Sequence, residues 1–435
     1  MKFWNEEMEC MDAAAMRALQ SERLRKIVRY TYDNVAFYRQ RMDECGTTPD
    51  DIHNIEDISL LPFMQKKDLR DNYPVGMFAA PLSDIVRFHA SSGTTGKPIV
   101  AGYTRADLDN WSEGIARCFT AYGVSRDDIA QISYGYGLFT GGLGVHEGAT
   151  KVGCSVLPAS TGNTAKQILL MKDLASTVLC STPSYALYLA EAIEQHPDIH
   201  IEDLRLRIGI FGAEPWTDAM RKSLEEKLHI RAFDIYGLTE VSGPGVGGEC
   251  ECQCGTHIWE DMFYPEIIDP VTLQPVVDGQ QGELVFTTLL KEGMPVIRYR
   301  TRDLTHLIRG KCACGRTAVR MGKILGRSDD MLIIRGVNVF PSQVEAVIME
   351  IPEFTGQYFI NVDRVNNVDT FDIDVELGFE HYTDSMDPLH RLKMRLTENM
   401  VSVLGIKPNI HIVEPGSIER SMGKAKHVLD KRNLQ

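Results

Sequence analysis

Between residues 85 and 300, short apolar segments alternate with amphipathic ones, and this alternation constrains the fold more than any other feature of the chain. Ile208-Gly209-Ile210-Phe211 is typical of a buried strand. It lies between a helix predicted near 183–195 and another predicted near 217–228. Alternation of this kind predicts an α/β core with a parallel or mixed sheet.

Two other patterns accompany this alternation, one before it and one that overlaps its end. Residues 8–45 carry apolar side chains near helical spacing and are predicted to form helices. Residues 244–310 are typical of hairpins, as in the strand-like segment from Gly282 to Thr288. We therefore expect mixed sheets and helices in the larger part of the chain.

The C-terminal part forms a separate unit in this interpretation. Residues 371–377 alternate apolar with polar side chains, as a half-buried strand does, and a later amphipathic helix ends at Gly405. A chain of 435 residues is also too long for one compact core. We predict an α/β protein with a large N-terminal domain over residues 1–327 and a small, mobile α+β domain over residues 328–435.

The formal net charge of −14 argues against nucleic acid or an anionic membrane surface as the main partner. The first residues, Met1 to Glu7, hold no apolar signal core, and no later run approaches about 18 uninterrupted apolar residues. We therefore expect a cytoplasmic protein. The ten cysteines are not expected to form a disulfide framework, because no secretion signal accompanies them.

The segment Ser91-Ser92-Gly93-Thr94-Thr95-Gly96-Lys97-Pro98 combines two glycines, four hydroxyls and a lysine. Such a loop is flexible and rich in donors, and it therefore suits the oxygens of a polyphosphate. It is not a P-loop of the Walker type, because only two residues separate its glycines and Pro98 follows the lysine. Taken alone, it is equally well explained as a surface turn.

Two further segments end predicted strands. Tyr236-Gly237-Leu238-Thr239-Glu240 follows an apolar strand ending at Asp234-Ile235, and Gly212-Ala213-Glu214-Pro215 ends the strand before it. A tyrosine ring can stack on a purine, a threonine hydroxyl can reach a phosphate, and a carboxylate can hold Mg²⁺ beside it. Ligands also bind at the carboxyl ends of strands in an open α/β sheet. A strand-end turn with a capping threonine is the alternative.

Three charged segments lie further along the chain. Asp303 could accept both hydroxyls of a ribose or form a solvated ion pair. Gly326-Arg327-Ser328-Asp329-Asp330 lies at the predicted domain boundary and suits a hinge from which Arg327 reaches a ligand. Lys424, which follows Gly423, would by itself be a solvated charge.

Two tight groups of potential metal ligands lie in the region predicted to form hairpins. The first group is Cys250, Cys252, Cys254 and His257, and the second is Cys312 and Cys314. Thiolates and an imidazole on two hairpins suit a tetrahedral structural Zn²⁺. His257, Cys312 and Cys314 are the firmer ligands, and the other three cysteines compete for the fourth place. Reduced free thiols are the alternative.

Taken together and in this order, these segments resemble the adenylate-forming superfamily of acyl-CoA synthetases, peptide-synthetase adenylation domains and luciferases. Within it, the chain is most similar to the phenylacetate–coenzyme A ligases, almost from end to end. That likeness is carried by four segments, Tyr134 to Gly142, Ile258 to Glu266, Arg327 to Leu332 and Gly336 to Pro341. Several ordered motifs are far more specific than any one of them.

The resemblance implies a two-step reaction. The carboxylate of an aryl acid, phenylacetate before others, attacks the α-phosphate of ATP to give an acyl-adenylate and pyrophosphate. The thiol of coenzyme A then displaces AMP. Loading of the acid onto a carrier protein is the alternative within this class, and a zinc-stabilised nucleotide sensor without catalysis is the alternative outside it. A homodimer is implied by the likeness alone.

The resemblance also implies a role for each motif. Lys424 would bridge the acid and the α-phosphate, Thr239 would contact the α-phosphate, and Glu240 would bind Mg²⁺. Asp303 would hold the ribose, and Arg327 the ribose or a phosphate. The other nucleotide-binding residues comprise the phosphate loop, Ser91, Ser92, Gly93, Thr94, Thr95, Gly96 and Lys97, the adenine contacts Glu214, Pro215 and Tyr236, and their neighbours Ala213, Asp234, Ile235 and Gly237.

The acid would bind beside the nucleotide. Tyr134, Tyr136 and Phe139, with the small Gly141, suggest a flat aromatic slot. Hydroxyphenylacetate, indoleacetate and benzoate compete with phenylacetate for such a slot. After adenylation, the resemblance implies that the small domain rotates about Asp329, withdraws the lysine and opens a channel for coenzyme A.

Overall fold

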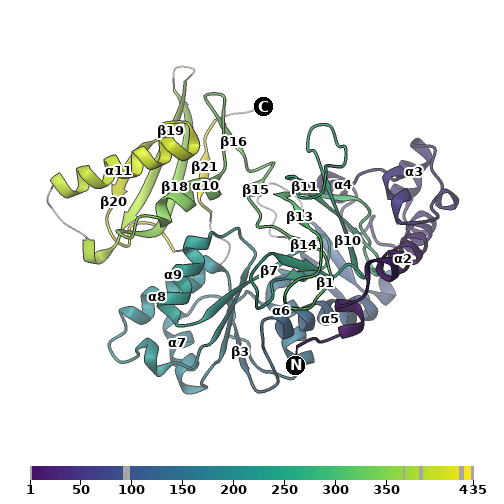
Figure 1. Cartoon of the computed structure of the whole chain (residues 1–435), viewed down its shortest axis with the longest axis horizontal. Helices are drawn as coiled ribbons and strands as arrows, with labels where there is room; N and C mark the ends of the chain where they lie inside the picture. The colour runs from purple at the N-terminus through teal and green to yellow at the C-terminus, as the bar shows by residue number, and fades with distance from the viewer. Residues whose placement is uncertain (1, 92–97, 366–367, 382–385, 421–425, 433–435) are drawn as a thin grey trace.

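The computed structural model describes residues 2–91, 98–365, 368–381, 386–420 and 426–432. A large unit fills most of Figure 1, and a smaller unit, coloured from light green to yellow, lies against one side of it. This arrangement confirms the predicted α/β fold with a large N-terminal and a small C-terminal domain. The boundary that we placed after residue 327 stays a prediction.

The centre of the large unit is a nine-stranded sheet of order β13-β14-β9-β8-β7-β6-β5-β3-β4. Its strands are β3 (Ile129–Ile132), β4 (Ser155–Leu157), β5 (Val178–Ser181), β6 (Ile208–Gly212), β7 (Arg231–Leu238), β8 (Gly243–Gly248), β9 (Thr256–Ile258), β13 (Leu307–Ile308) and β14 (Arg320–Met321). From β4 to β7 the neighbouring strands are parallel, whereas from β7 to β13 they are antiparallel. The strand predicted at 208–211 is β6.

Helices cover both faces of the parallel half. They are α5 (Arg105–Ala121), α6 (Thr140–Val152), α7 (Thr164–Asp173), α8 (Pro183–Glu194) and α9 (Asp218–Leu228). Val178 and Cys180 of β5 belong to the core that includes α5 and α6, and the intervening Leu179 belongs to the core formed with α7 to α9. Successive residues of a strand point to opposite faces, so β5 is buried throughout. The two helices predicted around β6 are α8 and α9.

The remaining elements of the large unit confirm the predicted N-terminal helices and central hairpins. A four-stranded antiparallel sheet of order β10-β11-β12-β15 contains β10 (Phe263–Ile268), β11 (Gly282–Thr288), β12 (Tyr299–Thr305) and β15 (Gly326–Arg327). A separate hairpin pairs β1 (Arg87–Ala90) with β2 (Val100–Tyr103). The first helices are α1 (Glu6–Glu9), α2 (Ala13–Asn34), α3 (Ala36–Glu44) and α4 (Lys66–Asp71), and short 3-10 helices cover Pro49–Asp51, Ile55–Leu60, Leu82–Asp84 and Ile201–Asp203.

The small unit has a hydrophobic core of its own. Its sheet of order β20-β19-β18-β21 consists of β18 (Phe354–Val365), β19 (Val368–Leu377), β20 (Asn409–Val413) and β21 (Val428–Asp430). The other elements are the hairpin of β16 (Leu332–Ile334) and β17 (Val337–Val339), the helices α10 (Pro341–Met349) and α11 (Met386–Leu404), and the 3-10 helix Phe379–His381. Phe371, Ile373 and Val375 of β19 are buried on one face, which confirms the predicted alternation.

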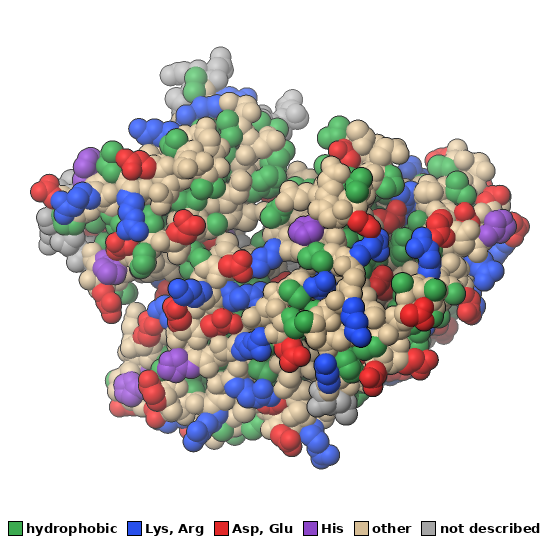
Figure 2. Space-filling model, in the orientation of Figure 1, with side chains coloured by type: hydrophobic (Ala, Val, Ile, Leu, Met, Phe, Trp, Pro, Cys, Tyr) green, Lys and Arg blue, Asp and Glu red, His purple; other side chains and the backbone are tan. Residues whose placement is uncertain are grey.

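Charged side chains of both signs are interspersed over the face seen in Figure 2. In the part of the chain that the structure describes, none of the helices has the length and apolar character needed to cross a bilayer.

The two units meet where α10 packs against α9. Met349 of α10 contacts the core formed by α7 to α9. Glu345 of the same helix is buried, with one carboxylate oxygen 3.3 Å from the hydroxyl of Tyr358. Burial, together with the charge of Glu214 in the large unit, raises the pKa of Glu345 to about 8. The carboxyl group of Glu345 is therefore mainly protonated at neutral pH when the units are docked.

Replacing Glu345 with glutamine should stabilise the docked arrangement most at alkaline pH. The carboxyl group takes up a proton on docking between its ordinary pKa of 4.5 and about pH 8, so stability falls as pH rises through that window and levels off above it. An amide carries no charge at any of these pH values. We expect thermal unfolding to show a melting temperature roughly 2–8 °C above the parent near pH 8.5, with little difference near pH 5.

Glu350, exposed at the end of the same helix, provides the matched control Glu350→Gln, which should change nothing at either pH. A gain for the Glu345 variant that is equal at both pH values would contradict the assigned titration.

Candidate functional site

The predicted nucleotide residues meet where β7 approaches β12 and β15. The hydroxyl of Tyr236 donates a hydrogen bond to Oδ2 of Asp303 at 2.6 Å, across 67 residues of sequence. Arg327 is paired with Asp303 in the register of β12 and β15, and its guanidinium lies 3.7 Å from the carboxylate. Tyr236 and Asp303 are both buried. An aromatic ring, a carboxylate and a guanidinium therefore share one site.

β7 is longer than predicted. We expected the strand to end at Asp234-Ile235, but it continues to Leu238, because Tyr236 and Gly237 pair with β8. A Cβ atom on Gly237 would collide with the backbone of Gly243, so only glycine fits this close approach. Gly237 therefore lies in tightly paired strand, and the chain reverses after Leu238.

Thr239 and Glu240 lie in the buried turn between β7 and β8. The hydroxyl oxygen of Thr239 is 3.3 Å from that of Thr140, the first residue of α6. The carboxylate of Glu240 forms an ion pair with Nζ of Lys66 at 3.1 Å. Lys66 begins α4 and lies in no motif that the sequence analysis singled out. The packing of α4 against β12 brings it to the site.

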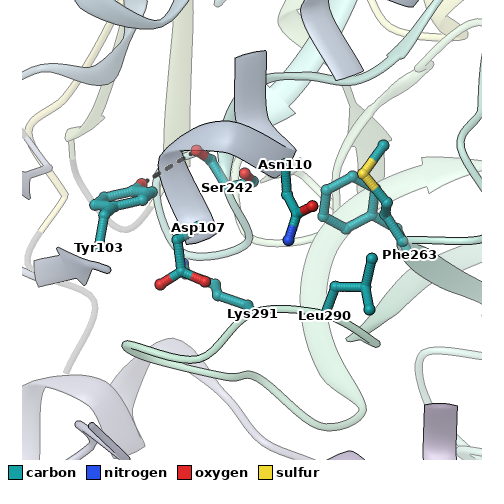
Figure 3. A pocket seen from close by; sticks show the side chains of 8 residues that line it. Tyr103, Asp107, Asn110, Ser242, Phe263, Leu290 and Lys291 are labelled. Carbon is teal, nitrogen blue, oxygen red and sulfur yellow. Dashed lines mark hydrogen bonds between the residues drawn. The ribbon is translucent and has the colours of Figure 1, made fainter. Parts of the chain in front are cut away.

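Lys291 and Tyr103 hold the backbone of this turn (Figure 3). Nζ of Lys291 donates to the carbonyls of Glu240 at 3.3 Å and Val241 at 2.9 Å. The Tyr103 hydroxyl donates to the carbonyl of Ser242 at 3.1 Å, the bond drawn as a dashed line in Figure 3. Burial lowers the pKa of Lys291 to about 8. Neither supporting residue was predicted. Side chains outside the turn therefore hold three successive carbonyls of the turn in place.

The end of β6 lies beside that of β7 in the parallel half of the sheet. Ala213 has a φ of +73°, an uncommon value for a residue with a side chain. Oε1 of Glu214 accepts a hydrogen bond from the backbone N–H of Ser184 at 2.7 Å, in the first turn of α8. On β7, Asp234 accepts one from the indole of Trp216 at 2.9 Å. The residues predicted to contact adenine therefore lie at the ends of two adjacent strands, β6 and β7.

Ser91 is the part of the predicted phosphate loop that the structure describes, and residues 92–97 lie outside the described residues. Ser91 donates its N–H to the carbonyl of Ile99 at 3.0 Å, and Ile99 donates its N–H to Oγ of Ser91 at 3.1 Å. The N–H of Ala90 bonds the carbonyl of Leu138 at 2.8 Å. The two ends of the loop are therefore held together beside the aromatic segment.

The predicted aromatic residues surround the start of α6. A Cβ atom on Gly141 would lie 2.5 Å from Cε1 of Phe139 and 3.4 Å from Cγ of Tyr134, so the glycine makes room for both rings. The hydroxyl of Tyr136 lies 3.1 Å from Nδ1 of His146, a residue of α6 that the sequence analysis did not identify. Because the first residue of α6 contacts the turn after β7, the aromatic group adjoins that turn.

Asp329, the residue that we predicted to be the hinge, lies in the connection between β15 and β16, and its role as a hinge stays a prediction. Both carboxylate oxygens of Asp329 accept hydrogen bonds from Arg327, at 2.9 Å each. Burial disfavours the charged guanidinium, but the hydrogen bond to Asp329 and the charge of Asp303 outweigh it and raise the pKa of Arg327. The arginine therefore stays charged between two carboxylates. Lys424 lies outside the described residues.

Four buried side chains of the large unit lie close together, namely Cys250, His257, Cys312 and Cys314. One potential ligand atom of each lies within 4.8 Å of those of the others. The Sγ atoms of Cys250 and Cys312 are 3.8 Å apart, and Sγ of Cys314 is 3.6 Å from Nε2 of His257. Antiparallel pairing of β9 with β14 brings the two hairpins together. The predicted ligand Cys252 lies outside this group.

Comparison with known proteins agrees with this architecture. The family model for AMP-binding enzymes matches residues 10–289, and that for the AMP-binding enzyme C-terminal domain matches residues 336–432. The phenylacetate-coenzyme A ligase of Pseudomonas putida is 51% identical over 98% of this chain and 96% of its own length. That of Escherichia coli K12 is 48% identical over 98% and 97%.

A solved structure of 2-hydroxyisobutyryl-CoA ligase in the postadenylation state superposes with a TM-score of 0.94, at 27% identity over 99% of this chain and 93% of that one. The same ligase in the thioesterification state, with its adenylate and CoA, gives a TM-score of 0.74 at 28% identity, over 100% and 93%. The sequence matches and the shared fold lead to one conclusion: this chain belongs to the adenylate-forming AMP-binding enzymes, and among them to the phenylacetate–coenzyme A ligase family.

Proposed function

We propose that this chain joins an aryl acid, phenylacetate in preference to others, to coenzyme A in an ATP-dependent reaction. The observation that carries the proposal is the contact between α6 and the turn after β7, at Thr140 and Thr239. This contact puts the aromatic residues around α6 beside the groups suited to a nucleotide. Identity near 50% to phenylacetate-coenzyme A ligases over almost the whole chain supports the same substrate.

In the first step, a carboxylate oxygen of the acid bonds to the α-phosphorus of ATP, and pyrophosphate leaves. The ring of Tyr236 would stack on the adenine, and Asp303 would accept the ribose hydroxyls with Arg327 beside it. In the second step, the CoA sulfur bonds to the acyl carbon, AMP leaves and the thiol proton is released. The residues contribute by orienting the reactants and balancing their charge.

Glu240 fits a Mg²⁺ ligand. Its buried carboxylate already has a cationic partner in Lys66, so this position accommodates a positive charge opposite the carboxylate. A bound Mg²⁺ would neutralise charge on the phosphate oxygens. The carbonyls held by Lys291 would keep the Glu240 backbone in place while its side chain exchanges partners.

The relative orientation of the two units supports the interpretation that this structure corresponds to the first step of the reaction. Superposition is closer on the postadenylation state of 2-hydroxyisobutyryl-CoA ligase than on its thioesterification state, with TM-scores of 0.94 and 0.74. We infer that Lys424 acts in the present arrangement and that rotation about Asp329 precedes the attack of CoA.

Lys424→Ala should lose the first step and keep the second. A charge that acts at only one of two transition states affects only that step. We expect ATP–pyrophosphate exchange to fall roughly 100-fold or more, while thioester formation from supplied phenylacetyl-adenylate changes less than about twofold. Lys426→Ala, two residues away, is the control and should leave both steps intact. An equal loss in both steps would refute the assignment.

The substrate proposal is tested by pyrophosphate release across a panel of aryl acids. Phenylacetate and benzoate differ by one methylene, which is worth roughly 10–200-fold in kcat/KM when a pocket is shaped for it. We expect phenylacetate to exceed benzoate by at least about tenfold. A preference for benzoate or indoleacetate would overturn the phenylacetate assignment but keep the ligase.

Gly141→Ala is the structural check on the same proposal, because its methyl group would press on Phe139 and raise the KM for the acid. Gly137 has open space around it, so Gly137→Ala is the control. Product formation only with a carrier protein, and none with free CoA, would favour the alternative acceptor. We also propose a homodimer, which sedimentation velocity would test.

We further propose that the Cys250, His257, Cys312 and Cys314 group holds a structural Zn²⁺. Two thiolates on one tetrahedral zinc lie about 3.8 Å apart, and a thiolate and an imidazole nitrogen about 3.6 Å apart. The observed separations of 3.8 and 3.6 Å fit these values. Arg316, buried beside this group and paired with Glu9, adds a positive charge that suits three thiolates. The metal would supply folding stability.

Protein purified without a histidine tag should contain about one equivalent of zinc by elemental analysis. Cys312→Ser combined with Cys314→Ser should lose the metal and melt at a lower temperature, because the zinc links two hairpins. Adenylation by the fraction that stays folded should be retained. Cys45→Ser, at an exposed cysteine elsewhere, is the control. Less than about half an equivalent in the parent, or no drop in the double variant, would identify the group as reduced thiols.

A further inference from the structure

We propose that Arg420 is a positioning residue for adenylation, which it serves by pairing with Glu191 of the large unit and so holding the two units in their docked orientation. This inference rests on the proposed function, because it concerns the half-reaction in which we propose that Lys424 acts. The pair joins residues 229 apart in sequence, one in each unit.

Within the small unit, Arg420 is firmly anchored. Its Nη1 and Nη2 atoms contact Oε2 and Oε1 of Glu376 at 2.7 and 2.6 Å, a bidentate pair. Glu376 lies in β19, is fully buried, and also accepts a hydrogen bond from the N–H of Ile418 at 3.1 Å. The guanidinium is therefore held firmly within the small unit.

The same guanidinium reaches across to the large unit. Nη2 of Arg420 lies 3.2 Å from Oε2 of Glu191 on α8, and the two side chains are only 15% and 16% exposed. Ion pairs at the open surface contribute little because water and salt screen them. This pair is largely shielded from both. Burial disfavours the charged arginine, yet the carboxylates of Glu376 and Glu191 raise its pKa, so it stays charged.

The position of Arg420 connects this pair to the lysine. Arg420 precedes Lys424 by four residues, so their Cα atoms are at most about 14 Å apart. Beyond the lysine, the chain joins β21, which pairs in parallel with β18 of the small unit. The described residues on either side of Lys424 are therefore held, by β21 on one side and by the contacts of Arg420 with both units on the other.

The pair depends on the orientation of the units, since α8 belongs to one and β19 to the other. The present arrangement superposes on the postadenylation state of the related ligase better than on its thioesterification state. Glu191→Gln removes the attraction across the interface but leaves Arg420 neutralised by Glu376. Unlike a change at Glu376, it does not strand a buried charge, and the fold should persist.

The test compares both half-reactions in the full-length protein. We expect Glu191→Gln to lower kcat for phenylacetate-dependent ATP–pyrophosphate exchange roughly 5- to 30-fold, with the KM for ATP within about twofold. Thioester formation from supplied phenylacetyl-adenylate should be unchanged or faster. The matched control is Glu194→Gln on the same helix, because Glu194 pairs with Lys227 inside the large unit at 2.6 Å. It should leave both half-reactions as they are.

Arg420→Lys is the second variant, which keeps the charge but loses the fork that spans two carboxylates. It should also lower ATP–pyrophosphate exchange without lowering thioester formation, but to a smaller extent than Glu191→Gln. Equal losses in both half-reactions, or undiminished exchange in Glu191→Gln, would overturn the positioning role. Failure of the parent to release pyrophosphate with any aryl acid would instead overturn the proposed function itself.

Discussion

The change from parallel to antiparallel pairing at β7 is the constraint on which the site depends. β7 pairs in parallel with β6 and antiparallel with β8, so the chain reverses just beyond the edge where β6 also ends. The reversal is tight, because Gly237 and Gly243 come too close for a side chain at Gly237. Lys291 and Tyr103 then fix its carbonyls. The turn after β7 and the end of β6 therefore lie together at one edge of the sheet, where ligands bind in open α/β sheets.

The buried carboxylates of the site are paired with cationic side chains of the protein. The buried carboxylates of Glu240 and Asp303 have Lys66 and Arg327 beside them. An unpaired carboxylate at such depth would be costly, and pairing removes that cost. These cations also suit a chain of net charge −14 that is to bind anionic substrates, since they act locally against a repulsive overall field.

The interface between the units contains contacts that favour docking and one buried acidic group that opposes it. Apolar contact at Met349 and the ion pair of Arg420 with Glu191 favour docking, whereas Glu345 must be buried with a proton. An interface containing such polar groups resembles a transient one more than a continuous core. This composition suits the rotation of the small unit that we propose between the two half-reactions.

Much of this protein follows from its sequence alone. Local periodicity determined β6, β19 and the helices α8, α9 and α11, because apolar spacing depends only on neighbouring residues. Ordered motifs identified the family, and they supplied most of the residues that we propose for the site. Only the tertiary structure decided that Lys66 pairs with Glu240, that Cys250 rather than Cys252 joins the His257 group, and that Arg420 meets Glu191. These contacts join segments far apart in the chain, and no local pattern encodes a distance across a fold.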